Sequence, residues 1–164
     1  MRELFMMPGP TEVAPSVIQS MCRPAISHGD PRFHDIMDRA SEQVAEIIGT
    51  SGQVVILNAS GRGGIEAAMS TSLEPIDRIL VINNGVFGNM LREIALRCRL
   101  DVMEVISEQG KPLDLDRIEY AASTPDLKAI AVVHSETSSG VLNPIREIGE
   151  IAGRFNLILS LIHI

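Results

Sequence analysis

The residues best suited to bind a ligand stand in three turns, each of which follows an apolar, strand-like run. The first turn, 58–68, reads Asn-Ala-Ser-Gly-Arg-Gly-Gly-Ile-Glu-Ala-Ala and leads into a helical pattern. Its glycines let the backbone wrap around an anion, and the free amides of a helix start point toward it. Ser60 adds a hydroxyl donor and Arg62 a guanidinium. The turn predicts a phosphate site, although a small-residue helix packed tightly on a sheet would explain the same glycines.

A dinucleotide-binding turn is the natural competitor, because Gly61 and Gly63 have its opening spacing. Its third glycine would fall at position 66, which is Glu66. The strand that follows should end in an acidic residue, yet Ile82 leads into Asn83. Both elements of the dinucleotide pattern are missing, and the sequence therefore disfavours a nicotinamide cofactor.

The other two turns carry an aromatic ring and a set of hydroxyls. In 83–88, Phe87 follows a strand and lies between two glycines, so its ring could lie flat against a planar ligand. It could equally anchor a helix to the core. The stretch 133–144 is dense in Ser and Thr and contains Glu136; these side chains could bind the polar edge of a ligand or cap their own loop.

Other chemistry is weakly supported. His28 and His34 are six residues apart, a spacing that does not place both rings on one helical face, and Asp30 before Pro31 is better explained as a helix cap. No metal site is predicted. Nothing links His134 to a particular nucleophile, so no catalytic triad is predicted either.

The elements that position these turns follow from the spacing of apolar residues. From Phe33 to Ile48 the apolar residues recur every three or four positions, which predicts a helix with one buried stripe, ended by Gly49. Short apolar runs then alternate with helical patterns, which indicates an α/β fold with a mostly parallel sheet flanked by helices. We expect helices near 16–22, 31–48, 65–73, 87–97, 115–122 and 145–154, and strands at 54–57, 79–82, 102–105, 129–133 and from 157.

Composition limits the class of partner. The 164 residues are 45% hydrophobic but only 3% aromatic, which predicts a globular, aliphatic core. A net charge of −7 without clustered Lys or Arg argues against a nucleic-acid partner. The two cysteines, Cys22 and Cys98, lack metal spacing and are expected to be reduced thiols. No apolar run is long enough to span a membrane, and we expect a cytoplasmic protein.

Together the three turns resemble those of the class V (fold type I) aminotransferases, which include the alanine–, serine– and ureidoglycine–glyoxylate enzymes. The motifs are Pro-Gly-Pro-Thr at 8–11, Ser-Gly-Arg-Gly-Gly-Ile-Glu-Ala at 60–67, Asn-Gly-Val-Phe-Gly at 84–88 and His-Ser-Glu-Thr-Ser-Ser-Gly at 134–140. They occur in the family's order, and the resemblance extends from about Met7 to about Ile158. It implies the N-terminal part of the large domain of a pyridoxal phosphate (PLP) enzyme.

The resemblance also implies roles for individual residues. Ser60, Gly61 and Arg62 match the turn that holds the PLP phosphate, although other residues also occur in the family at the position of Arg62. Phe87 matches the aromatic residue that stacks on the pyridine ring, and Thr137 a hydroxyl residue at the ring's edge. The implied reaction moves an amino group from alanine, serine or ureidoglycine to glyoxylate or pyruvate. The implied assembly is a homodimer.

Two catalytic groups of the family are not expected in this chain. The carboxylate that pairs with the pyridine nitrogen should stand near position 162, which is Ile162. The lysine that forms the Schiff base with the cofactor would lie beyond the chain, and Lys111 and Lys128 stand in unsuitable places. We therefore assign no catalytic residue and expect this chain to be inactive on its own.

The sequence predicts three segments: an N-terminal extension at 1–30, a partial PLP-binding large domain at 31–158, and a non-native tail at 159–164. The last six residues, Leu-Ser-Leu-Ile-His-Ile, match an in-frame reading of a common transposase sequencing adapter. Two alternatives remain open at this stage. One is a related desulfurase or lyase, which would share the phosphate turn, and the other is a truncated fold without catalytic activity.

Overall fold

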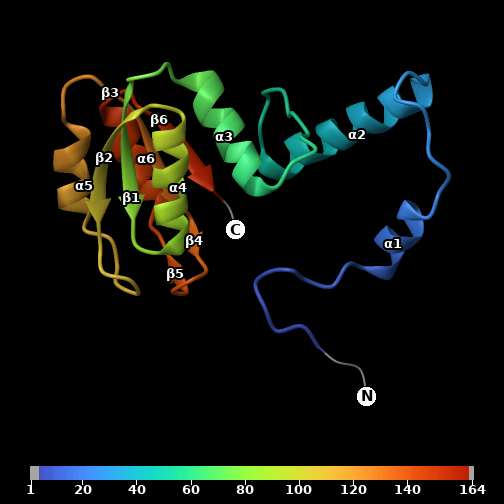
Figure 1. The fold of residues 1–164 in the computed structure, drawn as a ribbon, viewed down its shortest axis with the longest axis horizontal. Helices are drawn as coiled ribbons and strands as arrows, with labels where there is room; N and C mark the ends of the chain where they lie inside the picture. The colour runs from blue at the N-terminus through green and yellow to red at the C-terminus, as the bar shows by residue number, and fades with distance from the viewer. Residues whose placement is uncertain (1–3, 163–164) are drawn as a thin grey trace. The chain divides into compact units, whose positions relative to one another are not determined.

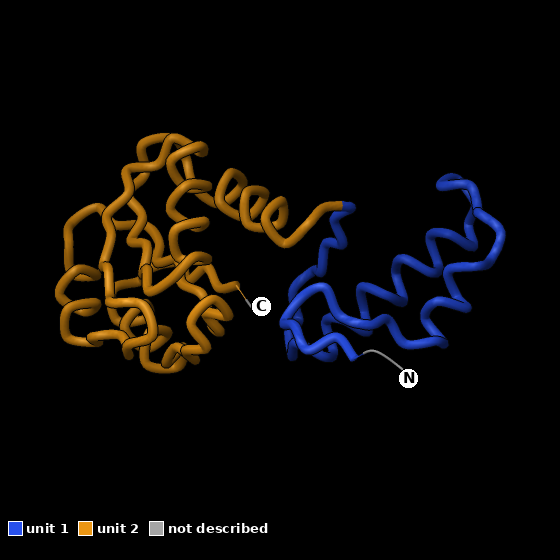
Figure 2. Tube along the Cα trace, turned by 60° about the horizontal axis from the view of Figure 1, so that its bottom comes forward, with its two compact units in different colours: residues 1–58 blue, residues 59–164 orange. Residues whose placement is uncertain are grey.

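The computed structural model describes residues 4–162. The chain forms two compact units, 1–58 and 59–164, which Figure 2 shows in different colours. Among the described residues, no helix is both long and apolar enough to cross a membrane. The boundary between the units lies after Asn58, whereas the sequence analysis divided the chain at residue 30. That division into an extension and a domain stays a prediction.

The described part of the first unit contains the helices α1 (Pro15–Met21) and α2 (Pro31–Ile48). The caps of α2 are those that the sequence predicts. The Asp30 carboxylate accepts a hydrogen bond of 2.9 Å from the Arg32 amide, and Gly49 ends the helix with φ of 69°. The guanidinium of Arg32 bonds the same carboxylate, and this bond lowers the pKa of Asp30 below its usual range.

Two predictions for this unit are wrong. The apolar stripe of α2 is not buried, and Ile47 is 81% exposed, because no described element of the unit covers this face. Residues 54–57 do not form a strand, and Val55, Ile56 and Leu57 are exposed. A strand exists only when a neighbour pairs with its backbone groups. The described part of the unit contains helices and loops but no strand that could pair with this run.

The second unit is an α/β sandwich (Figure 1). In chain order its elements are α3 (Gly61–Ser72), β1 (Arg78–Asn83), α4 (Val86–Arg97), β2 (Asp101–Ile106), α5 (Leu115–Ala122), β3 (Leu127–Val133), β4 (Ser135–Glu136), β5 (Val141–Leu142), α6 (Ile145–Arg154) and β6 (Ile158–Ile162). The sheet has the order β2-β1-β3-β6 with every neighbouring pair parallel, and β4 and β5 form a small antiparallel ladder. The predicted α/β class with a parallel, helix-flanked sheet is confirmed.

Alternation along the strands builds one core on each face of the sheet. Ile79 and Val81 of β1 pack with α3 and α4, whereas Leu80 and Ile82 pack with α5 and α6. After β1 the chain passes through α4 to β2, on one face of the sheet, and after β3 it passes through α6 to β6, on the other face. The connections therefore diverge between β1 and β3, and ligands bind at such a point beside the carboxyl ends of the strands.

Two details of this unit differ from the prediction. The β4–β5 ladder was expected to be loop, because two-residue strands leave no periodicity to detect. Lys128, which was expected just before the strand at 129–133, is the second residue of β3. Residues 158–162 pair with β3 along its length. Whether residues 159–164 are native stays a prediction, and residues 163 and 164 lie outside the described range.

Candidate functional site

A pocket of about 540 Å³ opens between the first turns of α3 and α4. It is lined by Ser60, Gly61, Arg62, Ile65, Phe87, Met90 and Ile162. This pocket therefore contains four of the five predicted site residues, namely Ser60, Gly61, Arg62 and Phe87. Ser60 and Phe87 are 27 positions apart in the sequence. The donors lie on the α3 side and the aromatic ring on the α4 side.

The start of α3 presents free hydrogen-bond donors. Ser60 is the N-cap residue, with φ of −72° and ψ of 165°, and its hydroxyl makes no capping bond to the helix. The helical ladder begins with the Gly64 amide, which donates to the Ser60 carbonyl at 3.1 Å. The amides before it are those that a helix leaves without an internal partner. The turn thus offers both a hydroxyl and backbone amides to an anion.

Arg62 adds the positive charge of the site. Its Nε lies 3.3 Å from the Sδ of Met90, so the side chain extends from α3 toward α4. Arg62 is exposed, and the guanidinium can also donate through its terminal nitrogens. An anion at the start of α3 would meet a helix dipole and a cation together.

Phe87 lies in the first turn of α4 and is half-buried. Its amide and that of Gly88 both donate to Oε2 of Glu136, each at 3.1 Å. The amide of Val86 donates to the Ser138 hydroxyl, also at 3.1 Å. The turn after β1 is therefore fastened to the loop after β3, and this fastening sets the position of the Phe87 ring.

Thr137 is the one predicted site residue that does not line the pocket. It is half-buried and stands between Glu136 and Ser138, the two residues that bond the start of α4. The structure thus ties its loop to the turn that carries Phe87. Its predicted role at the edge of a ligand ring stays a prediction.

A buried amide pair adds a second link between these turns. The Nδ2 of Asn84 donates to Oδ1 of Asn143 at 2.9 Å, and the Nδ2 of Asn143 donates back at 3.3 Å. Asn143 also donates to the Val133 carbonyl at 2.8 Å. The structural roles of Asn84 and Asn143 were not predicted from the sequence, whereas Glu136 was predicted either to bind a ligand or to cap its own loop. Polar residues directly after apolar strands were the available signal.

The pocket is lined by an isoleucine at position 162, where the family resemblance implies a carboxylate. Ile162 ends β6, pairs with Val133 and lines the pocket while only 8% exposed. Position 162 therefore faces the site, as expected, but its side chain cannot hold a proton on a ring nitrogen. Lys111 and Lys128, the two lysines of the chain, are both outside the pocket lining.

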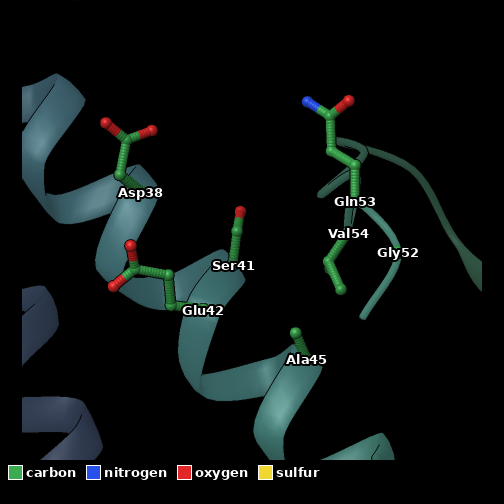
Figure 3. Close-up of a pocket in the computed structure, with 7 residues that line it drawn as sticks. All are labelled: Asp38, Ser41, Glu42, Ala45, Gly52, Gln53 and Val54. Carbon is green, nitrogen blue, oxygen red and sulfur yellow. The ribbon is translucent and has the colours of Figure 1, made fainter. Parts of the chain in front are cut away.

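A second hollow, within the first unit, has the wrong charge for a phosphate. Figure 3 shows its lining, with Asp38 and Glu42 on α2 opposite Gln53 in the following loop. The two carboxylates would repel an anion. In residues 4–162, no three His, Cys, Asp or Glu side chains gather closely enough to hold a metal ion.

Cys98 caps the far end of α4 and packs against the core. Burial raises the pKa of its thiol, and the negative charge of Glu66 raises it further. The thiol is therefore held in its protonated form and lies away from the first turn of α4.

Residues 7–161 match the sequence profile of the family described as aminotransferase class-V. The chain belongs to the class-V aminotransferase family. It is 36% identical over 147 residues to the (S)-ureidoglycine–glyoxylate transaminase of Bacillus subtilis, covering 89% of this chain and 35% of that protein. It is 35% identical over 145 residues to the soluble hydrogenase 42 kDa subunit of Anabaena cylindrica, covering 87% and 38%.

A solved structure agrees with this assignment. The ureidoglycine–glyoxylate aminotransferase of Bacillus subtilis superposes with a TM-score of 0.90 at 33% identity, over 95% of this chain and 41% of that one. The class-V aminotransferase chain described here thus spans less than half the length of the relatives it matches. Its fold is the N-terminal part of theirs.

Proposed function

We propose that this chain is the N-terminal part of a PLP-dependent aminotransferase that moves an amino group from a small amino acid to glyoxylate or pyruvate. Family membership supports the reaction class, and the relatives whose names include glyoxylate support the acceptor. The observation that carries the proposal is the shared pocket, in which phosphate donors and an aromatic ring come from two different helices.

The residues of the pocket fit PLP. Ser60, the first amides of α3 and Arg62 are all donors, the set that a phosphate dianion requires. Phe87, on the α4 side of the same pocket, provides an apolar face for a pyridine ring. Bound PLP supplies an electron-accepting ring that stabilises negative charge on the α-carbon of the amino acid. This chain's own contribution is to bind the phosphate, orient the ring and shield one of its faces.

Two groups needed for the chemistry have no counterpart among the described residues that line this pocket. Ile162 stands where a carboxylate would keep the ring nitrogen protonated, and the lining includes no lysine. We propose that the lysine belongs to the part of the enzyme that this chain does not contain. We also propose that residues 159–164 differ from the native sequence. Resequencing the locus tests this, and a continuous native gene with these codons would disprove it.

The phosphate role of Arg62 is tested in the full-length protein with Arg62→Ala. A hydrogen-bonded charge pair contributes about 1.5–3 kcal/mol, so PLP affinity should fall roughly 10- to 100-fold. Arg97→Ala is the matched control, because Arg97 is an exposed arginine in the last turn of α4, at the end away from Phe87. Unchanged PLP affinity in Arg62→Ala, measured by equilibrium titration, refutes the assignment.

The substrates are tested by assaying the full-length protein against glyoxylate with serine, alanine and ureidoglycine as donors. We expect transamination with at least one of them, and the sequence of the 60–67 turn leans toward ureidoglycine. Release of sulfide from cysteine without transamination would instead support the desulfurase alternative. We expect the full-length enzyme to be a homodimer, which analytical ultracentrifugation would establish.

A further inference from the structure

Two helices start at the edge of the pocket, and only one of them is open to a ligand. The first turn of α3 is capped by no side chain. The first turn of α4 is fully occupied from within the protein: Ser138 accepts from Val86, and Glu136 accepts from Phe87 and Gly88. An anion is attracted to either helix start, so this difference decides where an anion can bind.

Glu136 is the buried anion at the start of α4. Its side chain is completely inaccessible to solvent. While Oε2 accepts from the two α4 amides, Oε1 accepts from the amide of Ser138 at 3.2 Å and from its hydroxyl at 2.5 Å. Four donors thus surround one carboxylate. Burying a charged carboxylate is costly in free energy unless hydrogen-bond donors and a helix dipole compensate it, and both are present here.

The backbone of the turn lies directly on this carboxylate. A Cβ at Gly85 would overlap the carboxyl group of Glu136 and come within 2.7 Å of the Ser138 hydroxyl. The position of α4 is therefore set by contact as well as by hydrogen bonds. Since Phe87 is in the first turn of α4, its ring is placed by the same contacts.

We propose that Glu136 is a positioning residue for cofactor binding: it fills the anion site of α4, leaves the phosphate only the start of α3, and fixes the Phe87 ring against the pyridine. This inference rests on the proposed function. It assigns Glu136 no contact with the ligand. Its effect on the ring should therefore be separable from any effect on the phosphate.

The test is Glu136→Gln in the full-length protein. Glutamine has nearly the same size but only one acceptor oxygen, and its NH₂ group would oppose amides that now donate. Asp114→Asn is the matched control. Asp114 caps α5 by accepting from the Arg117 amide at 3.1 Å, and α5 packs on the opposite face of the sheet. Both changes turn a helix-capping carboxylate into an amide.

Calorimetric titration with PLP and, separately, with inorganic phosphate separates the two halves of the site. For Glu136→Gln we expect PLP affinity to fall about tenfold, the equivalent of one displaced hydrogen bond to a charged group, while phosphate affinity changes less than about twofold. The induced circular dichroism of bound PLP should also weaken, because the ring is no longer held in one orientation. Asp114→Asn should change none of these.

The outcomes are distinct. Equal PLP affinity in Glu136→Gln and the wild type overturns the inference, and so does an equal loss of PLP and phosphate affinity, which would indicate a general folding role. A wild type that binds no PLP overturns the proposed function itself. If Glu136→Gln does not fold, Ser138→Ala replaces it. That variant removes the hydroxyl shared by Glu136 and Val86 and should lower PLP affinity with phosphate affinity unchanged; no change in PLP affinity overturns the inference.

Discussion

Gly85→Ala is a one-methyl change whose effect follows directly from the packing of the site. Gly85 has φ of 177° and ψ of −164°, an extended backbone that alanine also adopts, so the change introduces no conformational strain. The new Cβ would overlap the carboxyl group of Glu136 and approach the Ser138 hydroxyl to 2.7 Å. Either α4 or the β4–β5 loop must move.

The size of the effect has two contributions. Overpacking a buried contact costs about 1–3 kcal/mol. If Glu136 shifts, its hydrogen bonds to Phe87 and Gly88 weaken, and each bond to a charged group contributes about 1.5–3 kcal/mol. Because partial relaxation relieves some of both, we expect a loss of about 3 kcal/mol in the free energy of unfolding. With an m-value of about 1–3 kcal/mol/M, the urea midpoint should then fall by roughly 1–3 M.

The assay is urea denaturation followed by far-ultraviolet circular dichroism, with Gly61→Ala as the matched control. Gly61 begins α3, and a Cβ there meets nothing within 4 Å. Alanine favours helix by about 0.5–1 kcal/mol over glycine, so this control should be no less stable than the wild type. If Gly85→Ala unfolds at the same urea concentration as Gly61→Ala, the described contact between Gly85 and Glu136 is wrong.

Three further predictions concern stability, thiol reactivity and association. Ile76 has a left-handed φ of 73° and is 84% exposed, so its side chain gains little from packing. Ile76→Gly should therefore raise the free energy of unfolding, measured by urea denaturation, by about 0.5–1 kcal/mol. Asn156→Gly is the control and should not raise it, because asparagine tolerates a φ of 53°. A thiol reagent at pH 8 should label the exposed Cys22 before Cys98, whose raised pKa keeps it protonated; peptide mapping with the reverse order would contradict this. The 164-residue chain alone should associate through the exposed stripe of α2 and the outer strands of its sheet, and a monodisperse, cooperatively melting monomer in size-exclusion chromatography would contradict this.

The parts of the fold that sequence predicts well are those with local signals. The helices at 115–122 and 145–154 have the predicted bounds, because each combines a three-four apolar spacing with a clear start. The four strands of the parallel sheet were predicted from their apolar runs, whereas β4 and β5 were not. Residues 54–57 carry the same kind of run but form no strand, because pairing depends on a neighbour that no local pattern reveals.

In the candidate site, too, some features could be predicted from local sequence signals and others depend on distant residues. The donors at Ser60 and Arg62 and the ring of Phe87 were predicted from turn chemistry and family motifs, and they do line one pocket. The role of Glu136 could not be predicted, because its partners are the amides of Phe87 and Gly88, almost fifty positions earlier in the chain. Backbone amides leave no trace in residue type. Only the fold shows which carboxylate they bond.

The most direct test of the account is a crystal structure of the full-length protein with PLP. The account predicts the phosphate at the start of α3, bonded by Ser60 and Arg62, the pyridine ring stacked on Phe87, and the Thr137 hydroxyl at the ring's edge. A cofactor bound elsewhere, or a phosphate at the start of α4 in place of the Glu136 carboxylate, would contradict it.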